Sequence, residues 1–78
     1  MKTNWRKYIT TDPKVMTGKP VIKKTRITVE LILEKLAEGE GFNQILESHP
    51  SLTRKTILAC MSYAVDSVKN ETAFSLAS

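Results

Sequence analysis

Two short runs of the chain concentrate the side chains that can bind a charged partner. The first is Lys23-Lys24-Thr25-Arg26 and the second is Thr53-Arg54-Lys55-Thr56. Ammonium and guanidinium groups bind phosphate oxygens and carboxylates, and hydroxyls can reach phosphates or base edges. The sequence therefore predicts a DNA-binding site and a second contact with phosphate or protein carboxylates: the first is formed by Thr53, Arg54, Lys55 and Thr56, the second by Lys23, Lys24 and Arg26.

Each of these cations also has a plainer role that the residues leave open. Arg26 can pair with Glu30 where the strand segment gives way to helix. The lysines of the first run can be solvated, and the cations of the second can form the solvated start of a helix. Cations in a first helical turn oppose the helix dipole, so their presence there slightly favours an anionic partner.

The inventory of reactive groups argues against catalysis. The chain has one His, one Cys and no cluster of such residues at metal-ligand spacing, and it lacks a phosphate-binding glycine pattern. Glu30, Glu34 and Glu38 fall on one helix face with no acid–base partner, and a solvated face explains them better. We therefore expect no enzyme, no metal, no cofactor and no small-molecule substrate.

Charge is distributed unevenly along the 78 residues. The chain carries 12 Lys and Arg against 8 Asp and Glu, a net charge of +4. Residues 1–28 hold eight of the cations and one acid, while residues 29–78 hold four cations and seven acids, giving +7 and −3. We expect a basic N-terminal arm at residues 1–8, with Trp5 and Tyr8 packing it onto the body or a second subunit, or stacking on bases.

The size and the ends of the chain set further expectations. A chain this short forms one domain with a thin core, which a partner or self-association can stabilise. The single Cys60 excludes an internal disulfide and fits a reducing compartment. The N-terminus is polar and basic, and no run approaches the ~20 apolar residues of a membrane span. The expected location is the cytoplasm, with no membrane partner.

Residues 9–29 are predicted to form a β segment. Their apolar residues come in short β-branched pieces separated by Asp, Gly and Pro, which is typical of strands and turns. We expect Val21-Ile22 to pair with Ile27-Thr28-Val29 in a hairpin. The basic run 23–26 then forms its loop.

Helical spacing begins at Val29. Thr28 is a suitable N-cap for a first helix that ends at Gly39. A second, short helix begins at Phe42 or Asn43 and is stopped by Pro50.

The third helix is predicted over residues 53–69, capped by Ser51 or Thr53. It carries an apolar stripe made of Ile57, Met61, Ala64, Val65 and Val68, flanked by Leu58. Cys60 is expected to be small core filler, and residues 71–78 a loose tail. The predicted fold is mainly α (α+β): an N-terminal β-hairpin arm and a three-helix bundle, within one domain over residues 9–70 whose bundle spans 29–70.

A short second helix joined to a third through His49-Pro50-Ser51-Leu52 is the arrangement of a helix-turn-helix. In that motif the first turn of the last helix enters the major groove while the helix before it crosses the backbone. DNA binding is the hypothesis that this arrangement favours, although most small helical bundles do not bind DNA.

Five motifs, in order, resemble a prokaryotic family, the domain-of-unknown-function family 433, over about residues 9–64. They are Asp12-Pro13, Gly18-Lys19-Pro20-Val21-Ile22, Thr25-Arg26-Ile27-Thr28-Val29, Leu36-Ala37-Glu38-Gly39 and His49-Pro50-Ser51-Leu52-Thr53 leading to Ser62-Tyr63-Ala64. The family is similar to homeodomain-like helix-turn-helix proteins. Its members often look like antitoxins of toxin–antitoxin systems, paired with a toxin that resembles a PIN-type ribonuclease.

Two positions depart from the pattern of that family. The family usually has Gly before the Thr-Arg pair and a second Gly before Gly18, where this chain has Lys24 and Thr17. A turn that needs a positive φ at position 24 would cost about 1 kcal/mol or more, or take another shape.

The resemblance implies an antitoxin-like regulator that binds a ribonuclease toxin and, as a homodimer, its own operator DNA. The rival hypothesis is a pure protein-interaction module that never touches DNA. In that case Arg26 or Lys24 would enter the acidic, metal-binding active site of the toxin.

Overall fold

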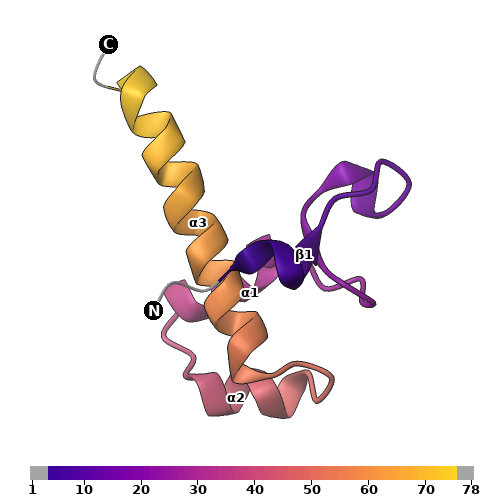
Figure 1. Cartoon of the computed structure of the whole chain (residues 1–78). Helices are drawn as coiled ribbons and strands as arrows, with labels where there is room; N and C mark the ends of the chain where they lie inside the picture. Colours follow the sequence, from indigo (N-terminus) through magenta and orange to yellow (C-terminus); the bar gives the residue numbers. More distant parts are fainter. Residues whose placement is uncertain (1–3, 76–78) are drawn as a thin grey trace.

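A computed structural model describes residues 4–75, and side chains as far as residue 70. Within this range the helices are α1 (Val29–Ala37), α2 (Phe42–Ser48) and α3 (Arg54–Ser75), and the strands are β1 (Ile9–Thr10) and β2 (Val21–Ile22). Two single turns, η1 (Trp5–Lys7) and η2 (Met16–Gly18), flank β1. The strands precede the helices (Figure 1), which confirms the predicted α+β fold class.

The small sheet differs from the predicted hairpin in its main partner. β2 pairs antiparallel with β1, with Ile9 opposite Ile22 and Thr10 opposite Val21. The predicted partner, residues 27–29, meets β2 only through a single bridge between Val21 and Thr28. The expected 27–29 strand is therefore wrong in extent, because Thr28 already caps α1 and the chain leaves the sheet there.

Local capping defines the helix ends much as predicted. The Thr28 hydroxyl accepts a hydrogen bond from the Leu31 N–H at 3.1 Å, and Gly39, with φ +96°, follows the end of α1. His49 leaves helical angles directly before Pro50, which ends α2. The Thr53 carbonyl accepts from the Ile57 N–H at 3.2 Å, so Thr53 and not Ser51 is the N-cap of α3.

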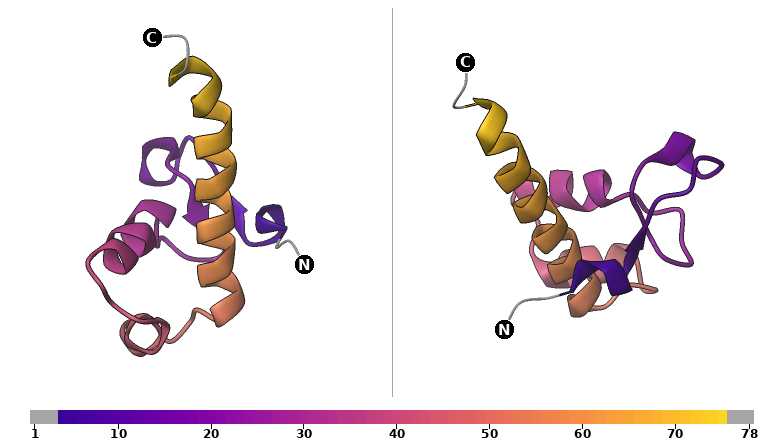
Figure 2. Two further views of the ribbon diagram at one scale, coloured as in Figure 1. Left: turned by 90° about the vertical axis from the view of Figure 1, so that its left-hand side faces the viewer. Right: turned by 45° about the horizontal axis from the view of Figure 1, so that its top comes forward.

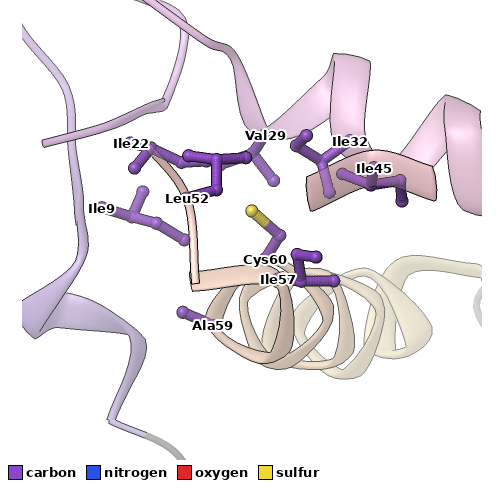
Figure 3. Packing of buried hydrophobic residues seen from close by; sticks show 9 residues of the cluster. All are labelled: Ile9, Ile22, Val29, Ile32, Ile45, Leu52, Ile57, Ala59 and Cys60. Carbon is purple, nitrogen blue, oxygen red and sulfur yellow. The ribbon is translucent and has the colours of Figure 1, made fainter. Parts of the chain in front are cut away.

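One apolar cluster joins the β arm to all three helices (Figure 3). The strands contribute Ile9 and Ile22, and the helices contribute side chains that are almost fully buried, including Ile32, Ile45 and Ile57. Cys60 is buried in the same cluster, as predicted for a small core residue. The core thereby fixes the strands against α1, α2 and α3.

α3 is longer than the sequence predicted. It continues to Ser75, past the expected end at residue 69 and into the segment 71–78 that was expected to be a loose tail. Residues 76–78 of that segment lie outside the described part of the chain. The C-terminal half of α3 extends beyond the other elements in all views (Figures 1 and 2).

The predicted apolar stripe of α3 divides between two environments. Ile57 is buried and Ala64 is half-buried, and the face toward the core also carries Ala59 and Cys60. The other stripe residues lie at the surface, together with Leu58: Met61, Val65 and Val68. The sequence thus identified a real apolar stripe that mostly does not face the core.

Candidate functional site

The first turn of α3 is held by two threonines. The Thr53 N–H donates to the Thr56 hydroxyl at 2.9 Å, and that hydroxyl donates to the Thr53 carbonyl at 2.6 Å. The Thr56 N–H in turn donates to the Thr53 hydroxyl at 3.3 Å. Both hydroxyls therefore satisfy backbone groups at the helix start, which is a capping role; the predicted contact of Thr53 and Thr56 with DNA stays a prediction.

The two cations of this turn lie at the surface. Arg54 is exposed, and its guanidinium carbon lies 4.8 Å from the centroid of the Phe42 ring, a cation–π contact that links the starts of α3 and α2. Lys55 is exposed and forms none of the ion pairs found within residues 4–70. The turn presents two positive charges, one of them pre-oriented by an aromatic ring.

Thr25 holds the basic loop, residues 23–26 of the β segment, in a fixed turn. Its N–H and its hydroxyl both donate to the Ile22 carbonyl, at 3.1 and 2.7 Å, and its hydroxyl accepts from the Ile27 N–H at 3.0 Å. Lys24 lies at φ +65°, in the left-handed region that favours glycine. This chain therefore keeps the left-handed turn at Lys24 in spite of the missing glycine.

The same adaptation occurs at the other departure from the glycine pattern. Thr17 lies at φ 55° and its neighbours Met16 and Gly18 at 49° and 82°, so the whole η2 turn is left-handed. A β-branched residue is rarely found there. Both substituted positions thus retain the backbone that glycine would adopt most easily.

Lys24 and Arg26 border an open hollow of about 640 Å³ on the β segment, residues 9–29. Its other walls carry hydroxyls and one acid: Thr10, Thr11, Thr25 and Asp12, with Val15 and Val21 as apolar lining. Asp12 already accepts from the Lys14 N–H at 2.9 Å, in a local turn. Two cations among hydroxyl groups suit an anion such as phosphate.

The predicted pairing of Arg26 with Glu30 is wrong. Glu30 instead pairs with Lys19, with 3.1 Å between Oε1 and Nζ, because the turn before β2 brings Lys19 to the first turn of α1. Within residues 4–70 no ion pair involves Arg26, and it lies at the surface together with Lys23 and Lys24. These three loop cations are therefore available to an external partner.

The loop 23–26 and the turn that leads into α3 lie on the same side of the fold. The loop 23–26 and the turn 49–53 that leads into α3 both protrude to the right in Figure 1 and in the right-hand view of Figure 2. The core residues between them hold this arrangement, since Ile22 precedes the loop and Leu52 precedes the α3 start. Arg54, which follows that turn, lies over the Phe42 ring at the start of α2.

Trp5 attaches the N-terminal arm to α3 by contacts that the sequence could not reveal. Its indole N–H donates to Asp66 Oδ2 at 2.7 Å, and its ring meets Tyr63 edge-on, with centroids 4.9 Å apart. Arg6 stacks on the Trp5 ring at 4.4 Å. Packing of the arm onto the body is confirmed for this residue; residues 1–3 of the predicted arm lie outside the described part.

The remaining candidate chemistry is sparse. Burial raises the pKa of the Cys60 thiol from 9.0 to about 11, so this thiol is a poor nucleophile. Among the described residues, no three His, Cys, Asp or Glu side chains are grouped so that they could hold a metal ion. Over the same residues, no helix combines the length and apolarity needed to cross a membrane.

Comparison with known proteins matches residues 9–64 to the family described as "Protein of unknown function (DUF433)". The chain is also 32% identical over 59 residues to "Uncharacterized protein y4eO" of Sinorhizobium fredii (strain NBRC 101917 / NGR234). That alignment covers 76% of this chain and 27% of the relative, so the chain spans about a quarter of the curated protein it matches. No solved structure gives a significant match.

Proposed function

The chain belongs to the DUF433 family, and from that premise we propose that it is a non-enzymatic, antitoxin-like regulator that binds DNA as a homodimer and also binds a PIN-type ribonuclease toxin. The observation that supports DNA binding is the presence of two groups of exposed cations, one in residues 23–26 and one in the first turn of α3, directly after the turn that joins α2 to α3. The toxin follows from the resemblance of family members to antitoxins.

In this proposal the two groups have different tasks on DNA. The first turn of α3 enters the major groove, where Arg54 and Lys55 reach base edges and phosphates. The loop 23–26 contacts phosphates beside the groove, which positions the protein without reading sequence. Thr53 and Thr56 hold the turn in shape, because their hydroxyls are engaged with the backbone.

Alanine substitution with a charge-matched control tests the DNA-binding part. Arg54→Ala/Lys55→Ala removes the cations of the α3 turn, and Lys7→Ala/Lys69→Ala removes two exposed cations elsewhere. The probe is a 5′-labelled duplex taken from the region upstream of the coding sequence, with a scrambled duplex beside it. We expect at least a tenfold loss of affinity for the first variant and less than a threefold loss for the control. Equal losses would refute groove reading by α3.

A second function, that of a pure protein-interaction module, has its own supporting observation. Arg54 is already stacked on Phe42 and both threonine hydroxyls are engaged, so the α3 turn offers few groups for base reading. The loop 23–26 offers three exposed cations, two of which border the hollow. In this case Lys24 and Arg26 contact carboxylates in the active site of the toxin.

A variant of the loop 23–26, Lys24→Ala/Arg26→Ala, separates the two functions. If this loop binds an acidic active site, the variant relieves inhibition of the partner ribonuclease, while Arg54→Ala/Lys55→Ala inhibits as well as the unaltered chain. If the loop only positions DNA, both variants lose DNA affinity and both still inhibit the ribonuclease. The assay is cleavage of a labelled RNA by the partner nuclease at a fixed ratio of the two proteins.

A further inference from the structure

Four large apolar side chains lie exposed along one face of α3. Leu58 and Met61 are each 41% exposed, Val65 is 50% exposed and Val68 is 61% exposed. Their spacing of three, four and three residues follows the alternating three- and four-residue steps of a helix that packs along a second helix. We call these four residues the outer seam.

The outer seam lies on a different face of α3 from most of its core contacts. At about 100° per residue its four members fall within an arc of about 80°, and the inward-facing residues Ala59, Cys60 and Tyr63 centre about 170° away. The buried Ile57, in the first turns of α3, borders the arc about 20° beyond Val68. A partner can therefore cover the seam without disturbing the packing of α3 on the body. An amphipathic helix with one buried face needs no second apolar stripe on the opposite side.

The seam is almost free of charge. From residue 56 to residue 68 the only charged residue is Asp66, whose carboxylate accepts from the Trp5 indole on another face of α3. The residues that flank the seam include Ser62 and Ala64, which are small enough for two helices to approach closely. Two copies of this surface can therefore meet without charge repulsion, as a two-fold interface requires.

We propose that the outer seam packs antiparallel against the outer seam of a second copy of this chain. A parallel pair would place the Arg54 and Lys55 turns of two protomers about 8–10 Å apart, where like charges repel. An antiparallel pair centred near residue 63 separates those turns by about 25 Å along the axis and opposes the helix dipoles. The extension of α3 beyond the body leaves room for the second copy (Figure 2).

This inference rests on the homodimer of the proposed function, and its test uses no DNA and no toxin, so the failure of one is distinguishable from the failure of the other. Sedimentation equilibrium of the full chain measures the dimer dissociation constant. Met61→Glu/Val65→Glu should raise that constant more than tenfold. Leu31→Glu changes a leucine of α1 that is 38% exposed, and it should shift the constant less than twofold.

The fold of the variants is checked by the near-ultraviolet circular dichroism of Trp5, which packs on another face of α3. A native spectrum with lost self-association supports the proposal. A chain that stays monomeric at about 200 μM, or a seam variant that dimerises as well as Leu31→Glu, overturns it.

Disulfide trapping in a Cys60→Ala background tests the direction of packing. In the antiparallel pair residue 58 of one copy lies opposite residue 68 of the other, within the ~4.4–6.8 Å between Cα atoms that a disulfide spans. A mixture of Leu58→Cys and Val68→Cys chains should form a heterodimer on mild oxidation. Rapid cross-linking of Leu58→Cys alone would contradict the antiparallel arrangement.

Discussion

Lys24→Gly should stabilise the protein although it removes a surface cation. Lys24 lies at φ +65°, where an L-residue costs about 1–2 kcal/mol relative to its preferred region. Glycine removes that cost but loses about 0.5–1 kcal/mol more chain entropy on folding. The expected net gain in the free energy of unfolding is about 0.5–1 kcal/mol, or a rise in Tm of about 2–8 °C for a chain this small.

The neighbouring lysine provides the control for that gain. Lys23 is also exposed and carries the same charge, but it is not among the described residues with positive φ. Lys23→Gly therefore gains nothing from the backbone and should lower stability by about 0.5–1 kcal/mol. Thermal unfolding followed by circular dichroism at 222 nm measures both. A Lys24→Gly variant no more stable than Lys23→Gly would refute the assignment of strain to this turn.

Three further predictions follow from contacts in the arm, the core and the α3 cap. Trp5→Phe keeps an aromatic ring at this position but removes the indole N–H and its hydrogen bond to Asp66, and it should lower the free energy of unfolding in urea by about 1–2 kcal/mol; an unchanged urea midpoint would show that this bond adds nothing. The pKa of the Cys60 thiol is about 11 in the folded chain and 9.0 when exposed, so the unfolded chain releases the proton first and stability should fall by about 1.4 kcal/mol per pH unit between pH 9 and 11. Urea unfolding at several pH values in that range gives the change of the free energy of unfolding with pH. The unaltered chain should lose this much more stability per pH unit than Cys60→Ala; identical slopes for the two chains contradict the prediction. Thr53→Ala should cost about 0.5–2 kcal/mol through loss of the α3 cap, whereas Ser51→Ala, at the rejected cap position, should leave the thermal midpoint nearly unchanged.

Features set by neighbouring residues were the ones that the sequence predicted well. The Thr28 cap, the glycine that follows α1 and the proline that ends α2 each act within one turn of the helix they limit. The left-handed position at Lys24 was anticipated as a cost, and the structure shows that the chain accepts this geometry. The strong apolar spacing also sufficed for the α+β class.

Features set by distant residues were not predictable. The pairing of β2 with β1, the Lys19–Glu30 ion pair and the Trp5–Asp66 hydrogen bond each depend on how the arm folds back. Periodicity also cannot say which of two apolar faces of α3 meets the body. The candidate site was predicted as two groups of cations, but the engagement of the Thr53 and Thr56 hydroxyls depends on the actual cap geometry.

The salt dependence of DNA affinity tests the central proposal most directly, because each phosphate contact contributes about −0.9 to the slope of log affinity against log salt concentration. Fluorescence anisotropy gives this slope for the unaltered chain and for Lys23→Ala/Lys24→Ala/Arg26→Ala. If the arm loop contacts phosphates beside the α3 turn, the triple variant should have a slope shallower by about 2.7 per protomer. A slope identical to that of the unaltered chain, or an unaltered chain that does not bind the duplex at low salt, would contradict the proposal.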